Sequence, residues 1–211
     1  MNTLTKEAQA ALTPKTSLDL LRAGNDRFQA NVRAGRNLLE QVRISGAGQF
    51  PYAVILSCID SRTSAELMFD LGPGDVFSVR VAGNIVNEDI LGSMEFACKL
   101  AGAKLVVVLG HSACGAIGGA CDGAKLGNLT GLLRKVQPAI DTVGQSDTMP
   151  REDRVQRVAE ANVDHVVTEV RAQSEVLEAM IADGSIGIVG AMYDVTTGVV
   201  SWGELSTGSA S

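Results

Sequence analysis

The chain has 211 residues and a mass of 22.0 kDa, a length that suits one α/β domain with a sizeable core and is short for two. Its 18 basic and 24 acidic residues give a formal charge of −6, which disfavours nucleic acid and anionic lipid as partners. It contains neither the apolar core of a signal peptide nor a membrane-spanning run of roughly 20 apolar residues. We therefore expect a single domain over residues 1–211 in the cytoplasm, with no nucleic-acid and no membrane partner.

The first fifty residues predict helices and no strand. Residues 1–15 are polar and aperiodic, so we expect a mobile or surface-draped lead-in there. Ser17 is the predicted N-cap of a helix that runs to about residue 35, with Leu18, Leu21 and Phe28 on one face. A second helical segment is expected at 38–44, before a Ser-Gly-Ala-Gly loop.

The rest of the chain alternates predicted strands and helices, which indicates an α/β fold. Apolar, β-branched runs at 52–56 and 105–109 predict buried parallel strands. Further strands are expected at 76–81 and 186–193, with a hairpin from the latter to 199–205; helices are expected at 64–71, 88–101, 129–143 and 151–183. The expected architecture is a central, mostly parallel sheet with an antiparallel edge strand, flanked by helices, and a flexible tail at 206–211.

Residue types that bind metals follow both buried strands. Cys58 comes directly after the first strand, and His111 and Cys114 come after the second. The carboxyl ends of neighbouring parallel strands meet at a topological switch point, so these side chains should converge. Two thiolates and one imidazole suit Zn²⁺, and three protein ligands leave one position open, as in catalytic zinc sites. The sequence therefore predicts a Zn²⁺ cofactor.

Asp60 and Arg62 follow Cys58 closely enough to curl around the same face of the metal. The carboxylate would accept a hydrogen bond from zinc-bound hydroxide and orient it, while the guanidinium holds the carboxylate in place and ionised. Because two thiolates cancel the charge of the ion, activity should rise with pH. An ordinary loop ion pair is the alternative, as is a structural zinc site closed by Asp60 as a fourth ligand.

Three other groups of this chemical kind are assigned structural roles. Cys98 falls on the inward face of its predicted helix, where a free cysteine behaves as a small hydrophobe. Cys121 lies in a glycine-rich run after the metal already has its protein ligands. His165 has no catalytic partner adjacent in sequence.

The Cys-x-Asp-Ser-Arg pattern at 58–62, followed by His-x-x-Cys at 111–114, resembles the β-class carbonic anhydrases. The resemblance covers roughly residues 16–202 and implies the strand order 2-1-3-4-5. It also implies a lyase that interconverts CO₂ and bicarbonate, as a homodimer or homotetramer. The substrate pocket that it implies contains Gln49, Phe77, Ala82 and Gly115, with Gln49 serving the neighbouring subunit. In the family the amino-terminal helix crosses to the partner; packing on its own domain is the alternative.

Several positions bear on the subtype. Val81 stands where asparagine is usual and Phe96 where many members have tyrosine, which puts a local hydrogen bond in doubt and removes a hydroxyl. Some bacterial members close the site by moving the motif aspartate onto zinc, beside a pocket of tryptophan, arginine and tyrosine. Arg80 and Tyr193 occupy two of those positions, but Ile55 occupies the tryptophan position and has no N–H to donate. We therefore predict the open, plant-like site, in which the Asp60 carboxylate is paired with Arg62 and not bound to zinc.

Two other functions stay open on the same fold. The first is hydrolysis of carbonyl sulfide or carbon disulfide, because the ligands alone do not separate these linear triatomic molecules from CO₂. The second is a zinc-stabilised binding protein without turnover. The presence of Asp60, Arg62 and Gln49 together argues against the second.

Overall fold

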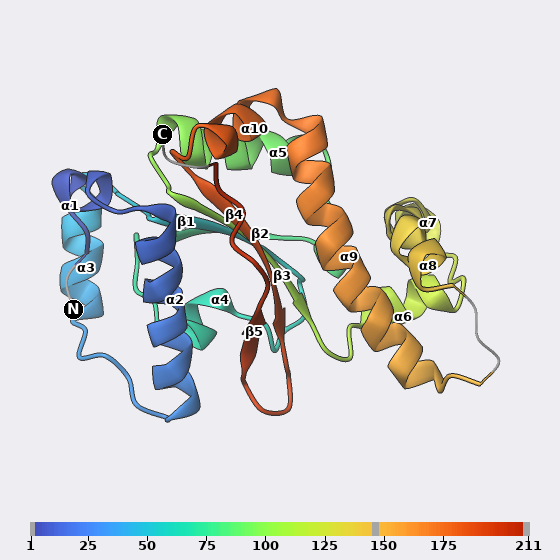
Figure 1. Ribbon diagram of the computed structural model, residues 1–211. Helices are drawn as coiled ribbons and strands as arrows, with labels where there is room; N and C mark the ends of the chain where they lie inside the picture. Colours follow the sequence, from blue (N-terminus) through green and yellow to red (C-terminus); the bar gives the residue numbers. More distant parts are fainter. Residues whose placement is uncertain (1–2, 145–147, 209–211) are drawn as a thin grey trace.

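A five-stranded sheet forms the centre of the computed structural model, which describes residues 3–144 and 148–208 (Figure 1). The strand order is β2-β1-β3-β4-β5. The strands are β1 Ala53–Ser57, β2 Val76–Arg80, β3 Leu105–His111, β4 Gly187–Tyr193 and β5 Val200–Trp202. All neighbouring pairs are parallel except β4 and β5, which are antiparallel. The predicted α/β class, strand order and antiparallel edge strand are confirmed.

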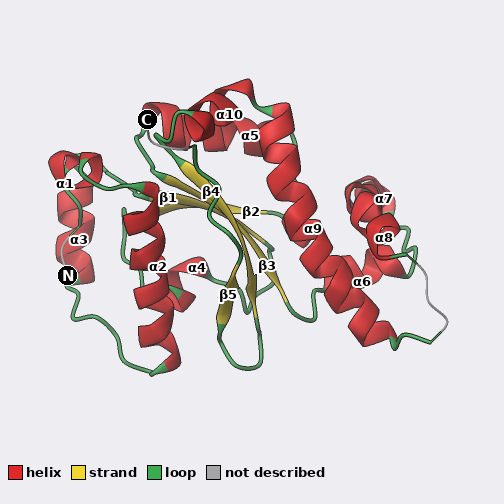
Figure 2. Cartoon of the chain, in the orientation of Figure 1, coloured by secondary structure: helices red, strands yellow, loops and turns green. Residues whose placement is uncertain are grey.

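Helices cover both faces of this sheet (Figure 2). The α-helices are α1 Lys6–Ala10, α2 Pro14–Gln29, α3 Leu38–Ser45, α4 Ala65–Met68, α5 Glu88–Glu95, α6 Gly115–Cys121, α7 Gly127–Leu133, α8 Gln137–Val143, α9 Arg151–Gln173 and α10 Glu175–Ala182. Short 3₁₀ or π segments are η1 Ala82–Asn84, η2 Phe96–Leu100 and η3 Arg134–Val136. None of these helices is both long and apolar enough to cross a membrane.

The two central strands are buried along their whole length because apolar layers lie above and below them. Alternate side chains point to opposite faces of the sheet. Those on one face, such as Val54, pack with α5, α9 and α10, and those on the other, such as Ile55, pack with α2 and α4. A third apolar cluster, under α6 and α8, contains Cys58 and Cys114. Continuous apolar runs therefore predicted these strands correctly.

The amino-terminal segment is more ordered than predicted. The side-chain amide of Gln9, on α1, donates to the carbonyls of Pro51 at 2.7 Å and Ala101 at 2.8 Å. Thr13 is the N-cap of α2 and forms a reciprocal capping box with Thr16. The prediction of Ser17 as the N-cap was wrong, since Pro14 is favoured in the first turn and Ser17 is buried inside the helix.

Helix α2 packs on its own domain in this chain. Its Leu18 and Leu21 are buried against the sheet, and α2 ends at Gln29 rather than near residue 35. Asn25 of α2 donates to the carbonyls of Met68 and Gly198, which ties the helix to α4 and to the β4–β5 turn. The apolar face of α2 is therefore covered by its own domain.

Four other predicted segments differ. The helix expected over 151–183 is broken at Ser174, whose extended backbone caps α10. The helix expected over 88–101 turns into the π-helical η2, and the one over 129–143 is interrupted by η3. At the tail, Ser206 forms an antiparallel bridge with Ile188, so 206–208 are not a free end; residues 209–211 lie outside the described residues.

Candidate metal centre

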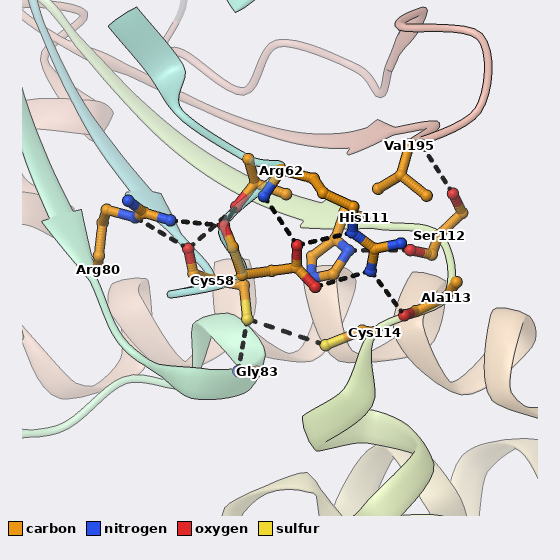
Figure 3. A network of polar contacts seen from close by, with 11 residues as sticks. Cys58, Arg62, Arg80, Gly83, His111, Ser112, Ala113, Cys114 and Val195 are labelled. Atoms are coloured by element: carbon orange, nitrogen blue, oxygen red, sulfur yellow. Dashed lines mark hydrogen bonds and ion pairs between the residues drawn. The ribbon is translucent and has the colours of Figure 1, made fainter.

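The ends of two adjacent parallel strands bring the three predicted metal ligands together (Figure 3). Cys58 follows β1 directly, His111 is the last residue of β3, and Cys114 is the N-cap of α6. All three are buried, and their ligand atoms lie within 4.8 Å of one another. Residues that are more than fifty positions apart in the sequence thus form one donor cluster.

The donor atoms fit a zinc ion. The two Sγ atoms are 4.0 Å apart, and two thiolates on a tetrahedral zinc would be separated by about 3.8 Å. Nδ1 of His111 donates to the carbonyl of Ser112 at 2.9 Å, so Nε2 is the nitrogen with a free lone pair. That Nε2 is buried and has no hydrogen-bond partner among the described residues, which a role as metal ligand explains.

The turn between the histidine and the second cysteine has an unusual backbone. Ala113 adopts φ +52°, a left-handed conformation that is uncommon for a residue with a side chain. The preceding residue, Ser112, is fixed because its Oγ accepts the backbone N–H of Val195 at 3.0 Å. The turn folds the chain back so that His111 and Cys114 face the end of β1.

The two thiols are electrostatically coupled. The pKa of Cys58 is lowered to about 4, chiefly because the Cys114 thiol donates to it, helped by the backbone N–H of Gly83. The pKa of Cys114 is raised by the neighbouring Cys58 sulfur and by burial. One thiolate therefore forms readily and the second is disfavoured without a cation, as expected for a site that binds a divalent metal.

Asp60 and Arg62 form a two-pronged ion pair beside this cluster. Nε and Nη2 of Arg62 donate to the two carboxylate oxygens at 2.9 and 2.7 Å, and its backbone N–H adds a bond of 3.0 Å. These hydrogen bonds hold the pKa of Asp60 far below its usual range. Nη2 also reaches the carbonyl of Ala113 at 3.3 Å. An ionised carboxylate is thus held at the edge of the metal centre.

The loop that carries Cys58 and Asp60 is held by its backbone carbonyls. Arg80 donates from Nε to the carbonyl of Cys58 at 3.0 Å and from Nη2 to that of Asp60 at 2.7 Å. The Thr63 hydroxyl donates to the Cys58 carbonyl as well, at 3.1 Å. The sequence analysis assigned Arg80 to the arginine position of the tryptophan–arginine–tyrosine pocket and did not anticipate this role, because a hydrogen bond to a backbone carbonyl leaves no sequence signature.

Two of the four predicted pocket residues lie near the cluster. Ala82 begins η1, next to Gly83, and Gly115 begins α6, beside a cavity of 440 Å³. Gln49 is exposed and precedes the amino end of β1, whereas the ligands lie beyond its carboxyl end, about 17 Å away along the strand. Phe77 lies in the middle of β2, with its ring 6.1 Å from that of Phe96.

The remaining candidates lie outside the metal cluster. Cys98 is buried in η2, where burial raises the pKa of its thiol to about 12. Cys121 is half-buried at the end of α6, and His165, on α9, lines a small cavity with Arg134 and Glu169. A cavity of 640 Å³ between α9 and the β4–β5 hairpin contains none of the three ligands.

Two residues near the cluster were not anticipated from the sequence. The backbone N–H of Gly83 points at the Cys58 sulfur, with N and Sγ 3.3 Å apart, and the side-chain amide of Asn162 donates to the Gly83 carbonyl at 3.0 Å. An asparagine inside the apolar stripe of the helix expected at 151–183 was the available signal for the second.

Comparison with known proteins gives one consistent family. The family model described as Carbonic anhydrase matches residues 53–200. Carbonic anhydrase 2 of Mycobacterium tuberculosis is 38% identical over 189 residues, which cover 88% of this chain and 90% of the relative. Among solved structures, the β-carbonic anhydrase CafA of Aspergillus fumigatus aligns with a TM-score of 0.72 and 29% identity, over 90% of this chain and 91% of that one. One of two tetrameric β-carbonic anhydrases of Sordaria macrospora aligns with a TM-score of 0.73 and 26% identity, over 92% and 97% of the two chains.

Proposed function

The chain belongs to the carbonic anhydrase family, as a member of its β class, and we propose that Cys58, His111 and Cys114 hold a zinc ion for the reversible hydration of CO₂ to bicarbonate and a proton. One observation carries the proposal: two thiols and an imidazole with a free nitrogen converge within 4.8 Å. Ligands of this kind suit zinc, and three of them leave a position for the reaction.

When bound, zinc acts as a Lewis acid that makes a nucleophile available from water near neutral pH. The work of the chain is to orient that nucleophile. The Asp60 carboxylate accepts a hydrogen bond from the attacking oxygen and aims its lone pair, and it stays ionised because Arg62 donates to both carboxylate oxygens. CO₂ is small and uncharged, which suits surroundings of small and apolar residues such as Ala82 and Gly115.

The open form of the site is favoured by the same contacts. Asp60 would have to give up three hydrogen bonds from Arg62 in order to reach the metal. Arg80 is engaged with backbone carbonyls, while Ile55 and Tyr193 are buried on the α2 side of the sheet. Together these contacts favour Asp60 on Arg62 as the resting state, rather than Asp60 on the metal.

A homodimer, with tetramers as a further possibility, is the proposed assembly. Gln49 is exposed and lies before the amino end of β1, too far from the metal cluster of its own chain to contribute to it. The site that it can complete is therefore that of a partner subunit. The tetrameric Sordaria macrospora relatives support an oligomer of this kind.

The deciding experiment is metal content measured together with CO₂ hydration by stopped flow across pH. We expect about one zinc ion per chain and hydration activity that rises with pH. Protein that contains no zinc, or zinc-loaded protein without CO₂ hydration, would contradict the proposal. Faster turnover of carbonyl sulfide than of CO₂ by the same preparation would identify carbonyl sulfide as the substrate instead.

A further inference from the structure

The buried side-chain amide of Asn162 hydrogen-bonds Gly83, the residue whose backbone N–H donates to Cys58. We propose that Asn162 is a positioning residue for the metal ligand Cys58 and acts through the backbone of Gly83. The inference rests on the proposed function, in that Cys58 is taken to be a ligand. It adds a residue from α9, an element that supplies no ligand itself, to the machinery of the site.

Two hydrogen bonds connect Asn162 to the sulfur. Nδ2 of Asn162 donates to the Gly83 carbonyl at 3.0 Å, and the Gly83 N–H donates to Sγ of Cys58 at 3.3 Å. Gly83 has φ +70°, which glycine adopts without strain because it has no Cβ, and for the same reason its two flanking peptide groups rotate more freely than those of other residues. Fixing the carbonyl of this residue therefore restricts where its N–H can point.

Asparagine is a costly choice at this position, which indicates a use beyond packing. Asn162 is 0% exposed, and its neighbours on the inward face of α9, among them Val158 and Val166, are aliphatic. Its Oδ1 has no hydrogen-bond partner among the described residues. Burying an amide with an unpaired oxygen is less favourable than burying an aliphatic side chain of similar size. The hydrogen bond to the Gly83 carbonyl is the interaction that an aliphatic side chain at this position could not make.

That bond has a chemical consequence at the sulfur. An N–H that donates to a metal-binding thiolate draws charge from it and keeps the side chain in one orientation. Outer groups of this kind tune the affinity of a site and the electronic character of the bound metal. Without the Asn162 amide, the Gly83 peptide can turn and its N–H is no longer held toward Cys58.

The test compares Asn162→Leu with Val170→Ala in the full-length protein. Leucine branches at the same atom as asparagine but is larger and has no donor, and Val170 is also 0% exposed, two turns further along the same face of α9. Zinc affinity is measured by chelator competition, and the thiolate-to-cobalt charge-transfer band is recorded after Co²⁺ is substituted. We expect Asn162→Leu to bind zinc about 10–100-fold more weakly and to move the band to longer wavelength, while Val170→Ala keeps both at wild-type values and lowers only Tm.

Wild-type affinity and an unshifted band in Asn162→Leu would overturn the inference and leave Asn162 a structural residue. Asn162→Ala, which removes the donor without adding atoms, replaces the leucine variant if that protein does not fold, with the same two results expected. Both readouts are independent of catalysis. Wild-type protein that binds metal but hydrates no CO₂ would overturn the proposed reaction alone, and the comparison of affinities would still decide the role of Asn162.

Discussion

His111 illustrates how a single side chain is prepared for a metal. Its Nδ1 is bonded to the carbonyl of Ser112, which keeps the proton on that nitrogen and directs Nε2 into the cluster. The ring is 1% exposed, so water does not satisfy Nε2 freely. Orientation and tautomer are thus set by the protein before any ion binds.

Alanine at any of the three ligand positions is expected to abolish stable zinc binding, because two protein ligands do not hold the ion well. Zinc content after dialysis should fall to less than about a tenth of the wild-type value for Cys58→Ala, His111→Ala and Cys114→Ala. Cys121→Ala is the matched control, a nearby cysteine outside the cluster that should retain full zinc. Full occupancy in one of the ligand variants would remove that residue from the ligand set.

Asp60→Asn should separate orientation from metal binding. The amide preserves the shape of the side chain but loses the charge that Arg62 stabilises, and its nitrogen does not accept the hydrogen bond of the nucleophile. We expect zinc content to stay at the wild-type level while CO₂ hydration falls by about 100-fold or more. Zinc loss in this variant would instead identify Asp60 as a ligand.

Elements far apart in sequence are tied together by a few buried polar side chains, of which Asn25 is the clearest case. Besides its two donated bonds, its Oδ1 accepts the backbone N–H of Val200 at 3.0 Å, so one side chain connects α2 with α4 and β5. The residue is 2% exposed. All of its hydrogen-bonding capacity toward the backbone is therefore used away from water.

Asn25→Leu should lower the free energy of unfolding by about 2–4 kcal/mol, because it removes three hydrogen bonds to buried backbone groups and a fourth from the side-chain amide of Gln29. Urea denaturation followed by circular dichroism measures the change. Asp26→Ala, at the adjacent exposed position, is the control and should stay within about 0.5 kcal/mol of wild type. A loss for Asn25→Leu as small as that of the control would show that these bonds contribute little.

The junction of α2 with α4 should also make the fold sensitive to acid. Burial alone would raise the pKa of Asp70, but the hydrogen bonds from Arg27 at 2.6 Å and from the N–H of Ala34 at 3.0 Å lower it overall. A folded-state pKa below the unfolded value means that the stabilisation is complete above about pH 4 and is lost as the pH falls through the folded value.

Asp70→Asn should therefore unfold more easily than wild type at pH 7, and the difference in Tm should shrink as the pH is lowered below about 4. Thermal melts across pH measure this. Asp19→Asn is the control, since that carboxylate is 45% exposed in its pair with Lys15. A difference between wild type and Asp70→Asn that does not change with pH would contradict the assigned role of the charge.

On the scale of the whole molecule, the site is expected to be completed across a dimer. Gln49→Ala and Asp60→Asn should each be nearly inactive alone, yet a refolded equimolar mixture should recover activity. Half of the randomly formed dimers contain one of each subunit, and one of their two sites then has both residues intact, so about a quarter of wild-type activity is expected. No recovery in mixtures that contain heterodimers would show that Gln49 acts within its own chain or not at all.

Features that depend on local pattern could be predicted from the amino-acid sequence. Apolar β-branched runs predict buried strands because a strand covered on both faces buries its side chains on both sides and so favours apolar ones, and β1, β3 and β4 are where those runs lie. The three metal ligands could also be predicted, because cysteine and histidine are residue types that bind zinc and they follow the ends of predicted neighbouring strands. Resemblance in these same motifs supplied the strand order, which the sheet confirms.

The breaks in the long helices and the residues around the donor cluster depend on contacts between elements that are distant in the sequence. Ser174 ends α9 because its buried hydroxyl bonds Glu95 of another helix at 2.6 Å, a contact that no helical periodicity contains. Arg80 and Asn162 act on backbone atoms of distant residues; the amide of Asn162 reaches a carbonyl 79 positions earlier in the chain. Every residue type has a backbone carbonyl, so the sequence does not show which carbonyl will accept such a hydrogen bond. The acceptor is determined only when folding brings two elements side by side.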